Sequence, residues 1–338
     1  MKSLRVKTQS EYEVTITDSL AAFTEKVSLL IKGDLVAVIT DSNVDGIYKN
    51  EIENSLTGKK VIKFVVPAGE ESKNVENYLK ILNGLADNGF TREDTVITFG
   101  GGVVGDLGAF VASTYMRGIK LIAVPTTLLS MVDSSVGGKT AINLEKGKNL
   151  CGTFYQPSAV YINTGFLKTL PKKEVLCGLG EILKYRFISK DAKIDISKID
   201  EDLIYKCLKI KADIVSKDEK ESGKRKLLNF GHTFGHAIEK LSHFTIPHGI
   251  CVAKGIVYAL KISEKYFGTS EKVRKDYILT AENLGIDVSC EYDLNELISL
   301  ISIDKKRSGK GADFVLIDDK FRPEIVNILL SEIKGYIL

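Results

Sequence analysis

The sequence lacks several features that would indicate a membrane, secreted or repeat protein. It has no tryptophan, no low-complexity tract and no internal repeat. No apolar run approaches the roughly 20 residues of a membrane-spanning helix. The first residues, MKSLRVKTQSEYEV, contain no apolar core of a secretory signal peptide. We therefore expect a globular protein of the cytoplasm that does not bind a membrane.

Cysteine is scarce, and so is an excess of charge of either sign. The five cysteines are odd in number, widely spaced and without a Cys-x-x-Cys pair: Cys151, Cys177, Cys207, Cys251 and Cys290. This pattern favours reduced thiols over a disulfide framework or a cysteine metal site. The 47 basic and 44 acidic residues are interspersed and leave a net charge of +3. That balance gives no reason to expect nucleic acid as a partner.

The first half of the chain alternates strand and helix patterns. Strands are predicted at Glu13–Thr17, Leu35–Thr40, Val61–Val66, Thr95–Phe99, Leu121–Val124 and Ala159–Ile162, and a helix at Asn74–Ala86. Strands that alternate with helices predict right-handed βαβ crossovers and a mostly parallel, Rossmann-like sheet. Ligands of such sheets bind beyond the carboxyl ends of the strands.

Near Thr164–Pro171 the pattern changes to long helical stretches. Helices are predicted at Lys172–Ser189, Asp202–Ser216, Leu227–Leu241, His248–Phe267, Val273–Leu284 and Leu294–Ile303, and a late hairpin from Phe314–Ile317 and Glu324–Ile328. A chain of 338 residues suffices for about two domains. We expect an α/β domain at residues 1–165 and a mainly α-helical domain at residues 166–338, with the cleft between them as the default site.

All four histidines lie in the stretch Asn229–His248. On a helix His232 and His236 share a face, and His248 follows a proline at the turn into the next helix. Because neutral imidazole is a common ligand for divalent metals, the cluster predicts a metal site rather than core histidines. A zinc-peptidase motif is excluded, since Thr233 stands where the general-base glutamate belongs. Spacing alone leaves open which two or three histidines bind.

The stretch Gly100–Gly105 matches Gly-x-Gly-x-x-Gly between a strand and a helix. Such glycines let backbone N–H groups approach a pyrophosphate at a helix N-terminus. The match stands on a late strand and has no acidic residue at the expected distance of about 20 residues. Asp41 and Asn43 end an earlier strand instead and are candidates to contact a ribose or adenine. We interpret the pattern as a dinucleotide site of non-standard form; the alternative is a plain tight turn.

The stretch Ser134–Thr140 resembles a phosphate-binding P-loop only superficially. A Walker A sequence needs glycine where Asp133 stands, so an ATPase is disfavoured. Lys139 is a candidate phosphate ligand that acts as a point charge, and Lys148 and Asn149 lie just downstream.

Glu181 and Lys184 lie three residues apart on one helical face, as a surface ion pair or as part of a site. A glutamate within reach of two histidines would complete a three-ligand metal site with open positions for substrate. A group of polar residues precedes the histidines in the sequence: Lys211, Glu221, Arg225 and Asn229. Together they offer cations for an anionic substrate and a group for proton transfer.

Several long motifs occur in a characteristic order: PAGEESK, GGGVVGDLGAFVASTYMRG, VPTTLLSMVDSSVGGKTAIN, GKNLCGTFYQP, GLGEILKY and LLNFGHTFGHAIE. On these motifs the chain, from about Asp41 to Lys306, resembles the 3-dehydroquinate synthase family of sugar-phosphate cyclases. The resemblance implies an N-terminal NAD-binding α/β domain, a C-terminal helical domain, a bound Zn²⁺ or Co²⁺ ion and a homodimer. After Phe314 no distinctive motif follows.

The resemblance also implies roles for individual residues. The metal ligands would be Glu181, His232 and His248. The substrate site would use Asp133, Lys139, Asn149, Lys184, Lys211, Glu221, Arg225, Asn229, His236 and one or both of Lys305 and Lys306. Arg117 would reach the phosphate of the substrate in the neighbouring subunit. NAD would contact Asp41, Asn43, Glu70, Lys73, Gly102, Val103, Val104, Gly105, Asp106, Thr126, Thr127, Lys139, Lys148, Phe166 and Thr169.

The implied reaction converts 3-deoxy-D-arabino-heptulosonate 7-phosphate to 3-dehydroquinate and phosphate in the shikimate pathway. It combines transient oxidation by NAD, β-elimination of phosphate, re-reduction, ring opening and intramolecular aldol closure, so NAD is regenerated in each turnover. One alternative is a metal- and NAD-dependent polyol or glycerol-phosphate dehydrogenase, which would release NADH. The others are a related cyclase that makes a cyclitol precursor and a non-enzymatic NAD-binding module, and the latter leaves the metal ligands unexplained.

Overall fold

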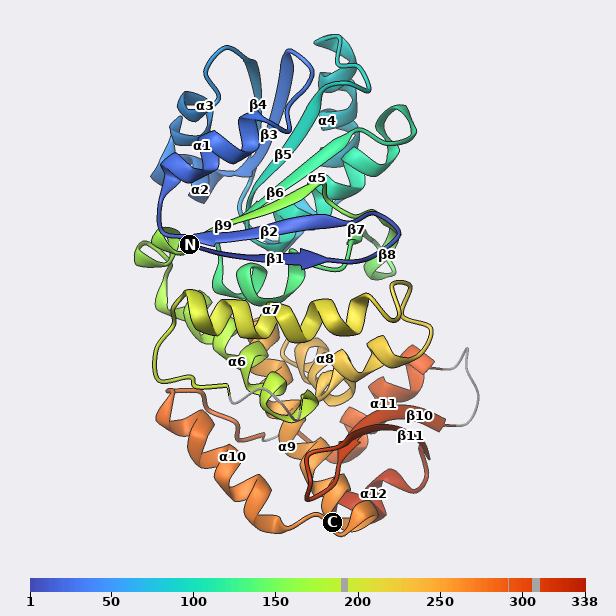
Figure 1. The fold of residues 1–338 in the computed structure, drawn as a ribbon. Coiled ribbons are helices and arrows are strands. Elements are labelled where there is room, and N and C mark those ends of the chain that lie inside the picture. Colours follow the sequence, from blue (N-terminus) through green and yellow to red (C-terminus); the bar gives the residue numbers. More distant parts are fainter. Residues whose placement is uncertain (190–193, 291, 306–310) are drawn as a thin grey trace. The chain divides into compact units, whose positions relative to one another are not determined.

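The computed structural model describes residues 1–338 except residues 190–193, 291 and 306–310 (Figure 1). For residues 303–305 it describes the backbone but not the side chains. The chain forms two compact units, Met1–Leu170 with Ile199–Ser216 and Pro171–Lys198 with Lys217–Leu338. The predicted site residue Lys306 and the side chain of Lys305 lie outside the described part, so their roles stay predictions. Among the helices that are described, none is long and apolar enough to cross a membrane.

The first unit is built on a seven-stranded sheet with the order β1-β2-β9-β6-β5-β3-β4. Its strands are β1 (Lys2–Val6), β2 (Tyr12–Thr17), β3 (Leu35–Asp41), β4 (Lys60–Val66), β5 (Thr95–Gly100), β6 (Lys120–Pro125) and β9 (Ala159–Asn163). β1 pairs antiparallel with β2, and the remaining pairs are parallel. The prediction of a mostly parallel α/β sheet is confirmed.

The direction of chain progression reverses at β3. This strand pairs with β4 on one side and with β5 on the other, so the connection after β4 returns across β3. Asp41 ends β3 and Gly100 ends the neighbouring β5. In open parallel sheets such a reversal leaves a crevice beyond the carboxyl ends of the two strands, where ligands bind.

Helices cover both faces of this sheet, which is why its central strands are apolar along their length (Figure 1). One side carries α1 (Leu20–Ser28), α2 (Ser42–Tyr48) and α3 (Glu51–Ser55), and the other carries α4 (Val75–Asp87) and α5 (Gly102–Thr114). Short helical turns are η1 (Glu70–Ser72), η2 (Tyr115–Arg117), η3 (Ser130–Ser134) and η4 (Thr164–Lys168). Leu107 and Val111 of α5 join Ile39 in the apolar core.

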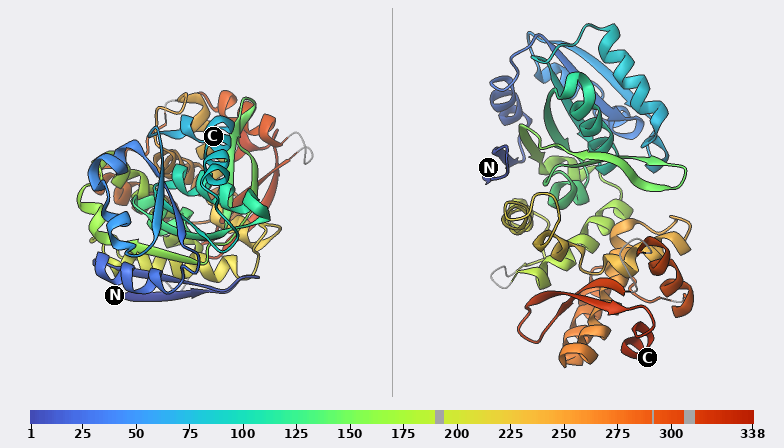
Figure 2. Two further views of the ribbon diagram at one scale, coloured as in Figure 1. Left: turned by 90° about the horizontal axis from the view of Figure 1, so that it is seen from above. Right: turned by 90° about the vertical axis from the view of Figure 1, so that its right-hand side faces the viewer.

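The helix predicted at Asp202–Ser216 is confirmed, but its place in this unit was not predicted, and neither was an antiparallel hairpin. Helix α7 (Glu201–Val215) runs along β1 and β2, although its pattern resembles that of the later helices. The antiparallel hairpin β7 (Lys139–Leu144) and β8 (Gly147–Phe154) is seen as a green ribbon in Figure 2. β8 is largely exposed, so it lacks the apolar alternation by which strands are identified.

The second unit is mainly helical. Its elements are α6 (Lys172–Ile188), η5 (Lys224–Asn229), α8 (His232–Leu241), α9 (His248–Phe267), α10 (Glu271–Asn283), α11 (Leu294–Lys305), the hairpin β10 (Gly311–Ile317) and β11 (Pro323–Leu329), and α12 (Ile333–Ile337). Helices α6, α8 and α10 pack against α9. The predicted hairpin is confirmed as an antiparallel pair, while the predicted helix Leu227–Leu241 is interrupted at Gly231, whose φ is 81°. The division of function between residues 1–165 and 166–338 stays a prediction.

Candidate metal centre and cofactor site

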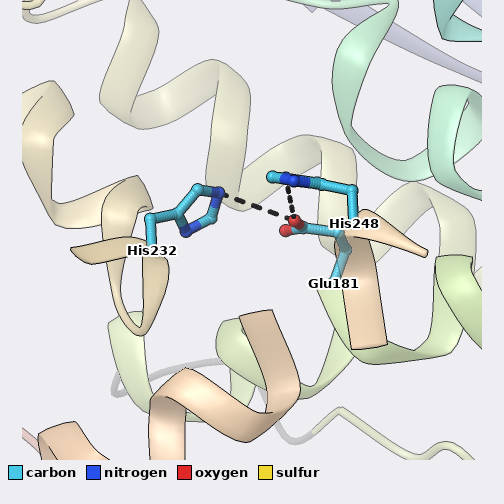
Figure 3. A group of neighbouring side chains, drawn as sticks. All are labelled: Glu181, His232 and His248. Atoms are coloured by element: carbon cyan, nitrogen blue, oxygen red, sulfur yellow. Dashed lines mark ion pairs between the residues drawn. The ribbon is translucent and has the colours of Figure 1, made fainter. Parts of the chain in front are cut away.

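Three side chains of the second unit converge on one point (Figure 3). Glu181 comes from α6, His232 is the first residue of α8, and His248 is the first residue of α9. One oxygen or nitrogen atom of each lies within 4.8 Å of the other two. Oε1 of Glu181 is 3.5 Å from Nε2 of His232 and 3.3 Å from Nε2 of His248. The cluster therefore offers one carboxylate and two imidazoles to a common space.

Close backbone packing brings these elements together. A Cβ atom at Gly180 would lie 2.1 Å from the carbonyl oxygen of Gly249, and one at Gly249 would lie 1.9 Å from that of Cys177. Only glycine permits α6 and α9 to approach this closely. Glu181 and His248 are the immediate neighbours of these glycines, so the helix contact fixes the distance between the two side chains.

The donor set fits a divalent transition metal. Zinc lies about 2.0–2.1 Å from a bound imidazole nitrogen or carboxylate oxygen. At a tetrahedral angle, two such donor atoms lie about 3.3 Å apart. The separations of 3.3 and 3.5 Å between Glu181 and the two histidines match this value. One carboxylate and two neutral imidazoles suit Zn²⁺ or Co²⁺ and leave positions for other ligands. The assignment of these residues as ligands stays a prediction.

Burial and nearby charges shift the pKa values of the two histidines in opposite directions. Glu181 is 1% exposed, and Nζ of Lys184 lies 2.5 Å from its Oε2. Burial lowers the pKa of His232 to about 3, against the raising effect of Glu181. Burial also opposes protonation of His248, but the carboxylates of Glu181 and Glu239 outweigh it and raise the pKa of His248 to about 10. An imidazole must be neutral to bind a metal, so a metal held by His248 would compete with its proton.

Of the other predicted residues of this unit, His236 lies beside the cluster, and Glu221, Arg225 and Asn229 lie on η5 or just before it. The ring centroid of His236 is 5.4 Å from that of His232 and 5.7 Å from that of His248. Nδ2 of Asn229 donates to Oε1 of Glu221 over 2.8 Å. Arg225 is 2% exposed and donates to the backbone carbonyl of Glu219. A buried guanidinium and an amide–carboxylate pair are groups suited to anion binding and proton transfer.

In the first unit a pocket lies at the carboxyl end of β5. Its lining includes Gly101, Gly102, Gly105, Asp106 and Lys139. Gly102 begins α5, so backbone N–H groups at the helix N-terminus are available to a phosphate. A Cβ atom at Gly105 would meet no described atom within 4 Å, so the space beside this residue is open. The first turn of α5, which also contains Val103 and Val104, is therefore open on this side.

Polar residues around this pocket are held in ion pairs. Nζ of Lys73, which is 4% exposed, lies 2.8 Å from Asp106 and 3.4 Å from Glu70. Burial raises the pKa of Asp106, and Lys73 opposes that rise. Lys211 on α7 forms a second pair, with Nζ 2.7 Å from Oδ1 of Asp133.

The remaining predicted contacts occupy loops and strand ends of the same unit. The Asp41 carboxylate caps α2 by accepting from the N–H groups of Asn43 and Val44. Thr126 and Thr127 directly follow β6, and Lys148 and Asn149 lie on β8. Phe166 packs on Tyr48, which also hydrogen-bonds Thr169. Arg117 is exposed, with a φ of 64° at the end of η2. The structure thus places every predicted NAD contact in the first unit.

Sequence reasoning missed one residue of the histidine cluster. Oε2 of Glu239 lies 3.1 Å from Nδ1 of His248. Glu239 follows His232 by seven residues, about two turns of one helix, so it shares the face of a predicted ligand. The spacing of Glu239 from His232 could be read from the sequence. The turn after α8 that brings His248 next to Glu239 could not.

Comparison with known proteins identifies one family over most of the chain. Residues 63–177 match the family model described as 3-dehydroquinate synthase N-terminal, and residues 178–307 match 3-dehydroquinate synthase C-terminal. The chain is 39% identical to 3-dehydroquinate synthase of Clostridium acetobutylicum, over 94% of each protein. It is 41% identical to that of Thermoanaerobacter pseudethanolicus, over 94% of this chain and 93% of the relative.

Solved structures share the fold. A 2-deoxy-scyllo-inosose synthase complexed with carbaglucose-6-phosphate, NAD⁺ and Co²⁺ has a TM-score of 0.89 at 25% identity and covers 99% of both chains. A 2-epi-5-epi-valiolone synthase from Streptomyces hygroscopicus with NAD⁺ and Zn²⁺ bound reaches 0.83 at 21% identity, over 96% of this chain and 95% of that chain. An iron-containing alcohol dehydrogenase reaches 0.66 at 12% identity, over 98% of this chain and 97% of that chain, a likeness of fold alone. On the two family models and the relatives of about 40% identity, the chain belongs to the 3-dehydroquinate synthase family.

Proposed function

We propose that the protein converts 3-deoxy-D-arabino-heptulosonate 7-phosphate to 3-dehydroquinate and phosphate, with NAD recycled in each turnover. The observation that carries this proposal is the cluster of Glu181, His232 and His248 in a chain about 40% identical to 3-dehydroquinate synthases along nearly its whole length. A dehydrogenase of similar fold is the alternative that the experiment below separates from it.

The metal ion would be held by Glu181, His232 and His248. When bound, Zn²⁺ or Co²⁺ supplies a Lewis acid that polarises substrate oxygens and favours the loss of a hydroxyl proton. Lys184 neutralises Glu181 in the metal-free protein and donates hydrogen bonds to a bound substrate. The Co²⁺ and Zn²⁺ named for the two cyclase structures support this choice of metals.

The cofactor would lie at the sheet reversal of the first unit. When bound, NAD⁺ accepts a hydride from a substrate carbon and returns it later in the same turnover. The N-terminus of α5 is suited to its pyrophosphate, and the open space beside Gly105 admits it. Asp41 lies at the end of β3, where an acceptor for ribose hydroxyls is needed. NAD⁺ in both cyclase structures supports the same assignment.

The substrate carries a phosphate and a carboxylate, so it needs several cations. We assign the phosphate to Lys139, Asn149 and one or both of Lys305 and Lys306. We assign the carboxylate end and hydroxyls to Lys211 and Arg225, with Asp133 and Asn229 as neighbouring polar contacts. The Lys211–Asp133 and Asn229–Glu221 contacts hold these groups in place before substrate binds. Glu221 and His236 would move protons during elimination and ring closure.

We also propose a homodimer in which Arg117 binds the substrate phosphate in the partner subunit. Exposure of Arg117 on a left-handed turn supports its availability to a second chain. Light scattering should give twice the monomer mass of 37.2 kDa. Arg117→Ala should raise the KM for the substrate without releasing metal, and a monomer with full activity would contradict this arrangement.

The test of the function uses purified protein, the heptulosonate phosphate, NAD⁺ and Zn²⁺, with released phosphate as the readout. Phosphate release should stop when the metal is removed by chelation and should return with Zn²⁺ or Co²⁺. Reduction of NAD⁺ by glycerol or another polyol, without phosphate release from the sugar phosphate, would reject the cyclase in favour of a dehydrogenase. Phosphate release that persists without metal would reject the assigned centre.

A further inference from the structure

We propose that Glu239 is a positioning residue of the metal centre, which holds His248 in the tautomer and orientation required to bind a divalent cation. This inference rests on the proposed function. Glu239 lies in the last turn of α8, and its side chain is 13% exposed. Its Oε2 is 3.1 Å from Nδ1 of His248, which begins α9. The contact therefore joins the end of one helix to the start of the next, across the turn that returns the chain.

Both ring nitrogens of His248 face carboxylates. Nε2 lies 3.3 Å from Glu181 within the ligand cluster, and Nδ1 lies 3.1 Å from Glu239 on the opposite edge of the ring. If Nδ1–H donates to Glu239, the neutral ring presents its lone pair at Nε2, toward Glu181 and His232. A metal ligand needs that lone pair, and an acceptor on the other nitrogen also increases its basicity.

His232 shows the same arrangement with a different acceptor. Its Nδ1 lies 3.3 Å from the backbone carbonyl oxygen of Phe230, while Nε2 faces Glu181. Each histidine of the cluster thus has an oxygen beside Nδ1, and only the one beside His248 belongs to a side chain. Glu239 also brings a second carboxylate beside the cluster, where the charge of Glu181 is already partly offset by Lys184, and so favours a bound cation.

The turn between α8 and α9 does not depend on the Glu239 carboxylate. The backbone carbonyl of Glu239 accepts from Oγ of Ser242 over 2.9 Å and from the N–H of Phe244 over 2.9 Å. Substitution of the side chain leaves both bonds in place. A change at Glu239 should therefore act on the orientation of His248 more than on the path of the chain.

The experiment compares Glu239→Gln and Glu239→Ala with a matched control, Glu264→Gln. Glu264 is also a helical glutamate of the second unit, 19% exposed and paired with Arg274 over 2.7 Å. Zinc affinity is measured by competition with a chelator, and the visible spectrum is recorded after loading with Co²⁺. We expect zinc affinity to fall by about tenfold to a hundredfold at Glu239, the range for groups that orient metal ligands. Glu239→Gln should fall less, because its amide oxygen still accepts from Nδ1–H, and Glu264→Gln should bind as the wild type does.

A changed Co²⁺ spectrum in the Glu239 variants would support the role, because a loss of stability alone leaves the ligand field of bound metal unaltered. Wild-type zinc affinity in both Glu239 variants would overturn it, and Glu239→Gln decides alone if Glu239→Ala does not fold. Failure of the proposed reaction is distinguishable. If zinc binds tightly and its affinity depends on His232 and Glu239, but no phosphate is released, the proposed reaction is wrong. The role of Glu239 in metal binding would then still hold.

Discussion

The two units carry candidate sites of different construction. In the first unit, the pocket at the end of β5 is lined in part by residues without side chains, among them Gly101, Gly102 and Gly105. In the second, the centre consists of side chains from three helices, which meet because Gly180 and Gly249 allow close packing. A backbone site depends on the path of the chain and on the space it leaves open. A side-chain site depends on each donor separately, so single substitutions should affect the two units in different ways.

The two units also differ in how their buried charged side chains are paired. In the first unit, Lys73 lies between the carboxylates of Asp106 and Glu70, and Lys211 pairs with Asp133. In the second unit, the buried carboxylate of Glu181 faces a lysine and two histidines. The second unit therefore gathers several titratable groups around one buried carboxylate, an arrangement that a bound cation could enter.

The largest contrast is expected from removal of one metal donor. His232→Ala should lower zinc affinity by more than the hundredfold upper range for outer residues, and phosphate release should be lost with it. Metal content after dialysis and activity measure both effects. His243→Ala is the matched control, because His243 is the exposed histidine on the turn after α8. If the His232→Ala protein holds no metal and keeps full activity, the metal centre is not needed for the reaction.

A smaller effect should come from the first unit, on stability rather than on metal. Lys73→Met leaves the Asp106 carboxylate without the cation that lies 2.8 Å away, which should lower the free energy of unfolding by about 3 kcal/mol. Urea denaturation measures the loss. Lys26→Met, which breaks an exposed pair with Glu13, should cost less than about 1 kcal/mol. Equal effects of the two substitutions would contradict the structural role of Lys73.

The smallest and most selective effect should separate two glycines of α5. A Cβ atom at Gly108 would lie 2.4 Å from Cγ2 of Thr98, so Gly108→Ala should destabilise the protein by about 1–3 kcal/mol. Gly105→Ala meets no described atom within 4 Å and should leave stability unchanged or slightly raised. It should nevertheless weaken NAD⁺ binding, which calorimetry measures. Unaltered NAD⁺ affinity in Gly105→Ala would place the cofactor elsewhere.

The sequence predicted much of the fold because most strands of the sheet are apolar runs and most helices have clear periodicity. It did not predict β8, whose residues are mostly exposed, or the packing of α7 on β1 and β2, which depends on partners far along the chain. Histidine spacing left the ligands open and on its own favoured the pair His232 and His236, whereas the resemblance implied His232 and His248. Glu181 enters the cluster only through the contact of α6 with α9, and the resemblance to a family supplied what spacing could not.

The most direct test of the central claim uses one equivalent of NAD⁺ per protein chain and a large excess of the heptulosonate phosphate, with Zn²⁺ present. Released phosphate and NADH absorbance are followed together. A redox-neutral cyclase should release many equivalents of phosphate for each NAD⁺ while NADH does not accumulate. Phosphate that never exceeds the NAD⁺ supplied, or NADH that rises in proportion to it, would contradict the recycling of the cofactor.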